Sequence, residues 1–185
     1  MHKYLAKDLM VPISEYATVE IGTPLIEAVQ ELEKAQGMYT DSKYQHRAVL
    51  VMDKSGNVIG KITQLRALKA IEPQFDFIDE IADIKKFKFS EDYLVKLRST
   101  YREQGKIINK RTLLSATKKK VEEFMQTHSP GEYIDEEGSL DQAIHKLVSG
   151  KHLSLLVTQG DKITGILRVA DVFTSVFGEI TDLKI

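Results

Sequence analysis

Two stretches of the sequence, GKITQLRALKA (60–70) and GILRVADVFTS (165–175), share one pattern: a glycine, a short apolar segment, polar residues, and then a helical repeat. The second stretch has Arg168 and Asp171 at its polar positions. A carboxylate only accepts hydrogen bonds, so Asp171 is suited to accept two of them from a vicinal diol. An arginine at the start of a helix, where free N–H groups already favour anions, is suited to bind a phosphate.

The same positions also have structural interpretations. A carboxylate such as Asp171 in the first turn of a helix is favoured by the helix dipole by about 0.3–1 kcal/mol, and Arg168 could simply pair with it or with a neighbouring acid. In the first stretch, Thr63 is a good N-cap for a helix that begins near Gln64. Arg66 cannot accept a hydrogen bond from a sugar hydroxyl, so it would either bind phosphate or fill an empty cleft.

Both stretches belong to a longer internal repeat. Met10-Val11 opens one copy and Met125-Gln126 opens the other, and a helix start follows in each: Thr23-Pro24 in the first, and a capping box of Ser139 and Gln142 in the second. Apolar residues then recur at the spacing of one helix face. The matching positions are Leu25, Ala28, Val29 and Leu32 in the first copy and Leu140, Ala143, Ile144 and Leu147 in the second.

Each predicted helix is followed by two strands and a second helix. The strands AVLVMD (48–53) and SLLVTQ (154–159) are apolar, and each leads through a tight turn into VIGKIT (58–63) or ITGILR (163–168). The first copy also contains a longer polar stretch, GMYTDSKYQ, over 37–45. The repeated order therefore predicts two hairpins, each of which leads into a helix.

We predict a fold of the α/β (α+β) class with two pseudo-symmetric strand–helix–strand–strand–helix repeats. The expected organisation is repeat 1 over 1–72, a helical insert over 73–118 and repeat 2 over 119–180. Within the insert, the spacing of apolar residues predicts a helix over 90–104. The insert is too short for a core of its own, so the repeats together form one module.

Composition argues against several classes of function. A formal net charge of −1 gives no electrostatic footprint for nucleic acid, and no apolar run is long enough to cross a membrane. The chain has no cysteine, which excludes thiolate metal sites and fits a reducing cytoplasm. The five histidines show no metal-ligand spacing, and common catalytic motifs are missing, so we expect neither a metal site nor an enzyme.

The Thr-Pro helix start, and a G-h-h-[ST]-x-x-[DN] pattern at the second strand–helix junction, resemble the CBS domain. CBS domains occur as tandem pairs whose sheets pack together. The family typically binds AMP, ADP, ATP or S-adenosylmethionine in clefts between the two halves, and it is regulatory and not catalytic. The resemblance therefore implies an adenosyl compound as a regulatory ligand, with no obligatory cofactor.

The resemblance also assigns roles to the polar residues. In the family the Asp accepts hydrogen bonds from the ribose diol and the Ser or Thr contacts ribose or phosphate. This chain divides that pair, because the first copy has Thr63 with Arg66, and the second has Arg168 with Asp171. We expect two unequal sites, of which the site at Asp171 is the better suited to ribose.

Further candidates come from the same resemblance. His46 and Arg47 are similar in place to a phosphate-contacting His-Arg pair in the regulatory subunit of AMP-activated protein kinase, although the structural alternative is an exposed loop. The adenine slot of the family corresponds to Val11-Pro12-Ile13 and to the segment from Thr127 to Tyr133. Tyr133 is suited to stack on a base, and it fits a half-buried strand aromatic equally well.

The function expected from the sequence is that of a stand-alone sensor of an adenosyl compound. By resemblance, we expect a homodimer through the helices of the CBS pair, with the insert 73–118 as a possible surface for a partner protein. The second hypothesis is an interaction module with degenerate, empty clefts. A third is a small hydrolytic enzyme that uses one cleft.

Overall fold

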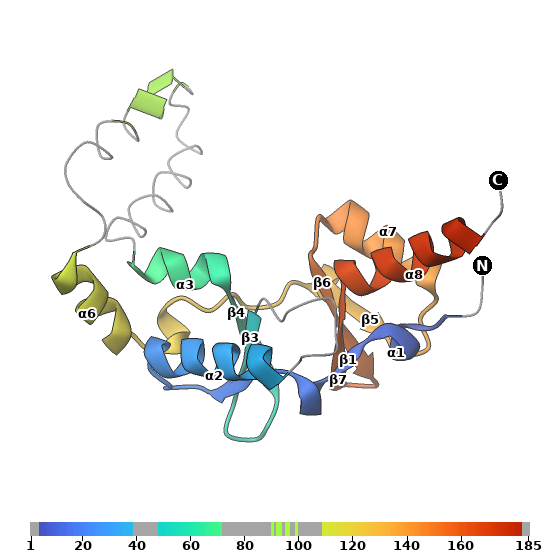
Figure 1. The fold of residues 1–185 in the computed structure, drawn as a ribbon, viewed down its shortest axis with the longest axis horizontal. Helices are drawn as coiled ribbons and strands as arrows, with labels where there is room; N and C mark the ends of the chain where they lie inside the picture. Colours follow the sequence, from blue (N-terminus) through green and yellow to red (C-terminus); the bar gives the residue numbers. More distant parts are fainter. Residues whose placement is uncertain are drawn as a thin grey trace.

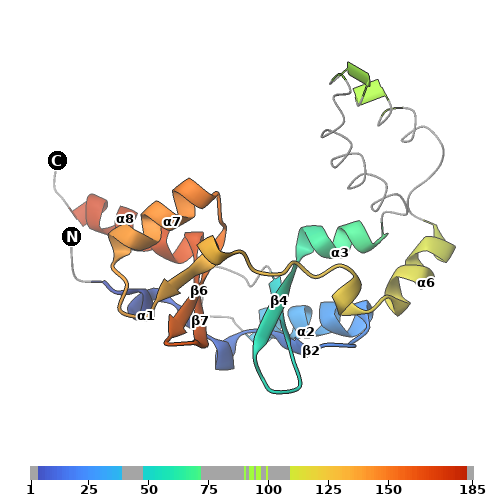
Figure 2. The ribbon, with the colours of Figure 1, turned by 180° about the vertical axis from the view of Figure 1, so that it is seen from behind.

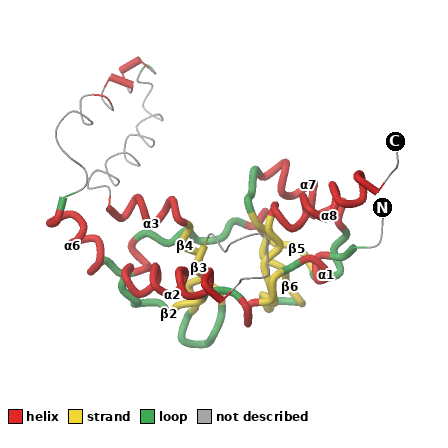
Figure 3. The backbone as a smooth tube through the Cα atoms, in the orientation of Figure 1, coloured by secondary structure: helices red, strands yellow, loops and turns green. Residues whose placement is uncertain are grey.

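The fold is an elongated arrangement of two β-sheets near the middle of the molecule, with helices on the outside (Figures 1 and 3). It was obtained as a computed structural model, which describes residues 4–38, 48–71 and 109–182, and between the last two ranges residues 90, 92, 93, 95, 96 and 99. The predicted helix over 90–104 and the polar stretch over 37–45 lie largely outside these residues.

The first half has a three-stranded sheet in the order β2-β3-β4, with β2 parallel and β4 antiparallel to β3. Val49, Leu50 and Val51 at the centre of β3 are fully buried, as a continuous apolar strand requires. The apolar stripe of α2, which includes Leu25 and Ala28, packs on this sheet. The elements are β2 (Thr18–Glu20), α2 (Leu25–Met38), β3 (Ala48–Met52), β4 (Val58–Thr63) and α3 (Gln64–Ile71).

The second half repeats this order, and its sheet has one strand more, in the order β1-β7-β6-β5. The predicted capping box is present: the Ser139 hydroxyl accepts a hydrogen bond from the N–H of Gln142, and the Gln142 side chain accepts one from the N–H of Ser139. The predicted strand–helix–strand–strand–helix repeat is confirmed in both halves. The elements are β5 (Tyr133–Asp135), α7 (Leu140–Gly150), β6 (Ser154–Gln159), β7 (Lys162–Arg168) and α8 (Val169–Asp182).

The opening segment of each repeat packs on the other repeat, which sequence patterns did not predict. α1 (Ala6–Leu9) and β1 (Val11–Pro12) cross to the second half, where β1 pairs antiparallel with β7. In the opposite direction, α6 (Lys110–Lys118) packs on α2 and α3, and Gln126 forms two backbone hydrogen bonds with Lys61 on β4. Each half of the molecule therefore includes a packed segment that comes from the other repeat.

Two glycine–methionine contacts secure these crossings. A Cβ added to Gly60 would lie 2.8 Å from the Sδ atom of Met125 and 3.1 Å from the carbonyl oxygen of Gln126. A Cβ on Gly165 would collide with Met10 and lie 2.9 Å from the carbonyl oxygen of Val11. Only glycine lets the opening segment approach the strand this closely. The contacts explain why glycine and methionine recur at matching positions of the two repeats.

An apolar cluster lies between the two sheets. Its buried members come from both halves, so it fixes how the sheets face each other. Ile13 and Tyr133 pack against this cluster and are partly buried. The helices α3 and α8, one from each repeat, lie on the same side of the molecule, at the top of Figures 1 and 2. The buried residues of the cluster are Val11, Tyr16, Leu50, Val58, Leu156 and Ile166.

Candidate functional site

Arg168 and Asp171 lie where β7 passes into α8, and they bind each other. Nε of Arg168 donates to Oδ2 of Asp171 at 2.7 Å, and Nη2 donates to Oδ1 at 2.6 Å. The backbone N–H of Arg168 donates to Oδ2 as well, at 3.2 Å. Their side chains are only 12% and 14% exposed. The pairing that the structural interpretation predicted is thus present, and it engages both carboxylate oxygens.

Tyr16 is buried beside this pair, and sequence reasoning missed it. It follows the short 3₁₀ helix η1 (Ile13–Glu15), which packs against β7 because β1 pairs with that strand. Burial raises the pKa of Tyr16 to about 12; the Arg168 guanidinium opposes this rise and the Asp171 carboxylate adds to it. Tyr16 therefore stays neutral at physiological pH. The structure brings Tyr16, Arg168 and Asp171 together, and Ile13 packs against the apolar cluster to which Tyr16 belongs.

Thr63 and Arg66 occupy the matching positions in the first repeat, where β4 passes into α3. The Thr63 hydroxyl oxygen accepts a hydrogen bond from the N–H of Arg66 at 3.2 Å, which confirms the predicted N-cap. At α8 the direction is reversed, because Asp171 accepts from the N–H of Arg168. A capping box needs both bonds in one helix. Each repeat here has only one of the two bonds. The motif that is divided between the repeats therefore forms two different helix caps.

A nearly buried ion pair lies near this first junction, and it too was missed by sequence reasoning. Nζ of Lys61 on β4 lies 2.5 Å from Oε2 of Glu132, with side chains 12% and 4% exposed. Burial alone would raise the pKa of Glu132, but the hydrogen bond and the charge of Lys61 outweigh it and hold that pKa below its ordinary value. The Ser129 hydroxyl also donates to Glu132. The matching position of Lys61 in the second repeat is the apolar Ile166, so the two junctions differ in polarity.

His128 and Tyr133 complete this group. Their rings meet edge to face with centroids 6.2 Å apart. His128 is buried, and neither ring nitrogen has a hydrogen-bond partner among the described residues. Burial lowers the pKa of His128, the nearby Lys61 lowers it further, and Glu132 opposes this effect. Tyr133 lies on β5, at the opposite edge of the four-stranded sheet from β1.

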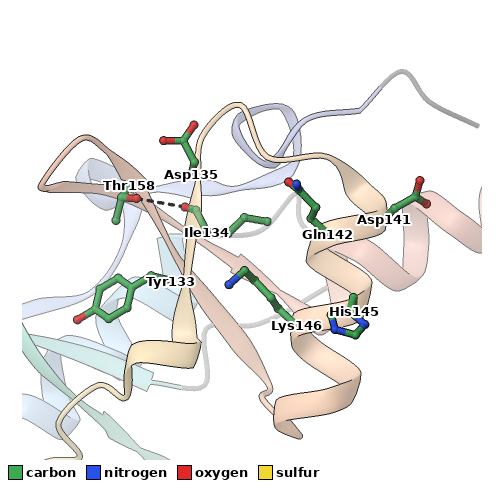
Figure 4. Close-up of a pocket in the computed structure, with 8 residues that line it drawn as sticks. All are labelled: Tyr133, Ile134, Asp135, Asp141, Gln142, His145, Lys146 and Thr158. Atoms are coloured by element: carbon green, nitrogen blue, oxygen red, sulfur yellow. Dashed lines mark hydrogen bonds between the residues drawn. The ribbon is translucent and has the colours of Figure 1, made fainter.

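A pocket of about 580 Å³ lies at a different place, against the edge strand β5 and helix α7 (Figure 4). Lys146 reaches from α7 toward the strand. Of the predicted site residues that the structure describes, Tyr133 alone lines it. His46 and Arg47 lie outside the described residues. The lining residues are Tyr133, Ile134, Asp135, Asp141, Gln142, His145, Lys146 and Thr158.

Over 4–38, 48–71 and 109–182, together with the few described residues between the last two ranges, no cluster of three or more His, Cys, Asp or Glu side chains has the arrangement of a metal site. None of the helices in those same ranges is long and apolar enough to span a membrane.

Comparison with known proteins identifies a domain in the first half of the chain and the fold of the whole. The sequence model of the CBS domain matches residues 6–73, and the fold of the whole chain matches solved CBS-domain structures. By sequence, residues 6–73 are a CBS domain. Its fold resembles a CBS domain-containing protein of unknown function from Bacillus anthracis, with 18% identity over 100% of this chain and 96% of that one and a TM-score of 0.62.

Two further CBS structures are similar along nearly the whole chain. The CBS-pair protein CBSX2 from Arabidopsis thaliana has 16% identity over 96% of this chain and 97% of its own, with a TM-score of 0.59. CBSX2 in complex with AMP has 17% identity, coverage of 96% and 99%, and a TM-score of 0.58. At these identities the likeness shows the fold alone. No protein with a curated description matches this chain by sequence.

Proposed function

We propose that this CBS-domain protein is a regulatory module that binds an adenosyl compound at the junction of β7 and α8. The observation that carries the proposal is the position of Asp171, a carboxylate in the first turn of α8 close to the buried Tyr16 of the other repeat. A ligand held there touches chain from both repeats. The AMP complex of the similarly folded CBSX2 supports this choice of ligand class.

The chemistry of the junction suits an adenosine nucleotide. Asp171 is the acceptor for the ribose hydroxyls, and Arg168 with the N-terminal N–H groups of α8 is the donor set for a phosphate. Ile13 supplies apolar surface for adenine. His46 and Arg47 keep their proposed role as further phosphate contacts. AMP, ADP, ATP and S-adenosylmethionine are the candidate ligands.

We expect the junction in the first repeat to bind more weakly. Thr63 is engaged as a cap, and Arg66 replaces the carboxylate that would accept ribose. Nearby, Lys61 and Glu132 already neutralise each other. Tyr133, the predicted stacking residue, packs edge to face with His128, which lies near Lys61 and Glu132.

Binding acts through the arrangement of the two repeats and not through catalysis. A ligand shifts the equilibrium between two relative arrangements of the repeats only by its different affinity for them. A ligand bound between β7 and η1 contacts both repeats. The output we propose is a change in a homodimer formed through α3 and α8, or in a partner protein bound over 73–118. We place this activity in the cytoplasm.

Isothermal titration of the purified chain with AMP, ADP, ATP and S-adenosylmethionine tests the proposal. We expect at least one of them to bind with a sub-millimolar Kd, and Asp171→Ala to weaken that binding at least tenfold, about 1.4 kcal/mol. A loss of only a few tenths of a kcal/mol would remove Asp171 from the ribose role. His145→Ala, on the exposed face of α7, is the matched control.

The second candidate is an interaction module whose junctions stay empty. The bond between Arg168 and Asp171 favours it, since both carboxylate oxygens are satisfied without a ligand. If none of the four compounds binds at sub-millimolar concentration, this function replaces the first one.

A further inference from the structure

The hydrogen bonds at Asp171 leave too few acceptor positions for a ribose diol. An ionised carboxylate has about four lone-pair positions on its two oxygens. Arg168 fills three of them, two on Oδ2 through its backbone N–H and Nε, and one on Oδ1 through Nη2. A vicinal diol that donates both protons needs two. Ribose can therefore bind only if the guanidinium gives up at least one of its bonds.

Releasing Arg168 is unfavourable unless the ligand supplies an anion. The guanidinium is only 12% exposed and lies beside the buried Tyr16, so water compensates poorly for the lost carboxylate. Tyr16 has a raised pKa and so provides no negative charge there. A phosphate accepts the same bidentate pair of hydrogen bonds that the carboxylate accepts. The phosphate can thus replace Asp171 as the partner of the guanidinium when the ribose binds.

We infer that Arg168 is a specificity latch, which reserves Asp171 for adenosine compounds that have a 5′-phosphate. The inference rests on the proposed function and narrows its ligand class. Adenosine brings the diol but no anion, so it cannot compensate for the release of Arg168. S-adenosylmethionine has a sulfonium cation at the 5′ carbon, where a nucleotide has its phosphate, and this cation repels the guanidinium. The latch therefore selects AMP, ADP or ATP over both.

The first repeat shows that the latch is specific to α8. There the N-cap position has Thr63 and the third helical position has Arg66, so neither of these two positions has a carboxylate. The divided motif thus has a physical consequence. The substitution of Thr by Arg in the second repeat adds a counter-ion for the ribose acceptor, and so couples ribose binding to the presence of phosphate.

Isothermal titration of the full chain with AMP, adenosine and S-adenosylmethionine tests the latch, using the wild type and Arg168→Gln. For the wild type we expect AMP to bind at least tenfold more tightly than adenosine, and S-adenosylmethionine no more tightly than adenosine. In Arg168→Gln, which removes the two hydrogen bonds of the guanidinium to Asp171, we expect adenosine to bind at least tenfold more tightly than it binds the wild type. The ratio of AMP to adenosine affinity should then fall to within about threefold of one. Arg111→Gln, which removes an exposed charge from α6, is the matched control and should leave every affinity unchanged.

Each outcome has a defined meaning. If the wild type binds AMP but the ratio is below twofold, or the ratio is unchanged in Arg168→Gln, the latch is wrong while the proposed function stands. If neither protein binds any of these three compounds or ADP or ATP, the proposed function and the latch both fail. Should Arg168→Gln not fold, Arg168→Lys serves instead: it keeps the charge, loses the bidentate geometry, and is expected to lower the ratio by at least threefold. An unchanged ratio in that variant would also overturn the latch.

Discussion

Lys61 and Glu132 join the two repeats by an ion pair of 2.5 Å that is almost closed to solvent. Lys61 lies on β4 of the first sheet, and Glu132 immediately precedes β5 of the second. The segment between Gln126 and Glu132 is the chain that crosses from one half to the other. The pair therefore holds this crossing segment in place. At the matching position of the other repeat, Ile166 makes an apolar contact instead.

Breaking this ion pair from one side should destabilise the protein strongly. In Glu132→Gln the buried Lys61 loses its counter-charge, and such losses cost about 3–5 kcal/mol. The double variant Lys61→Ile with Glu132→Ala copies the residues at the matching positions, Ile166 and Ala17, and should come within about 1 kcal/mol of the wild type, since apolar replacement of a buried pair is often neutral. The free energy of unfolding in urea measures both. A double variant less stable than Glu132→Gln would contradict this account.

His128 should make the stability of the protein depend on pH in a defined direction. Burial and the charge of Lys61 lower its pKa below the ordinary value of 6.5, so the unfolded chain binds the proton more readily than the folded one. The free energy of unfolding therefore rises with pH between the folded pKa of His128 and about 6.5. This stability is lost as the pH falls from about 6.5 toward the folded pKa. The groups that face His128 are Lys61, Glu132 and Tyr133. Glu132 has a lowered pKa and contributes in a more acidic range, as the pH falls below its ordinary value of 4.5.

We expect His128→Phe to flatten the stability profile between pH 7 and pH 5. A single histidine contributes a slope of at most about 1.4 kcal/mol per pH unit, and that slope should disappear from urea unfolding curves recorded at pH 5, 6, 7 and 8. His145→Phe, on the exposed face of α7, is the control and should leave the slope unchanged. If both variants behave like the wild type, the buried neutral state of His128 is wrong.

The repeated fold could be predicted because its signals are local. The apolar spacing of Leu25 and Ala28, repeated at Leu140 and Ala143, dictates which helix faces are buried, and all four residues are buried as expected. The exchange of opening segments was not predictable in this way. β1 is only Val11–Pro12, too short for any periodicity, and its partner β7 is distant in the sequence, so tertiary packing alone decides the pairing.

The contacts of the candidate site also differ in whether the sequence could predict them. Arg168 and Asp171 are three residues apart at a helix start, so their contact was one of two interpretations that the sequence allowed. Tyr16 joins them only because β1 crosses to β7, and no local pattern indicates this. Lys61 and Glu132 are likewise brought together by the crossing chain. Whether Arg168 and Asp171 together select a phosphate is a question of energy that no residue pattern answers.

The close approach at Gly165 should make that position intolerant of a side chain. In Gly165→Ala the new Cβ meets Met10 and a backbone oxygen, so the strand must shift, which typically costs about 1–3 kcal/mol. Gly60→Ala should cost less, because its nearest backbone oxygen is slightly farther away. Gly178→Ala in α8 has open space around its Cβ, and it should stabilise the helix by about 0.5–1 kcal/mol. Urea unfolding of the three variants should give this order, and a neutral Gly165→Ala would contradict the close packing of the crossing.

The proposed homodimer should depend on an exposed aromatic pair on α8. Phe173 and Phe177 stack with centroids 4.2 Å apart and are about half exposed. α3, which lies on the same side of the molecule, also exposes Leu65 and Leu68. Burying such apolar surface in a dimer is favourable by about 25 cal/mol per Å². A charge placed there opposes that burial, so Phe173→Glu is expected to shift the chain from dimer to monomer.

Analytical ultracentrifugation over a range of protein concentrations measures this shift. Val148→Glu is the matched control, because Val148 on α7 is 72% exposed and belongs to neither α3 nor α8. We expect the control to keep the dimer and Phe173→Glu to raise its dissociation constant at least tenfold, since a buried, unpaired carboxylate is costly. A wild type that is monomeric at every concentration, or an equal effect of the two variants, would show that α8 does not form the interface.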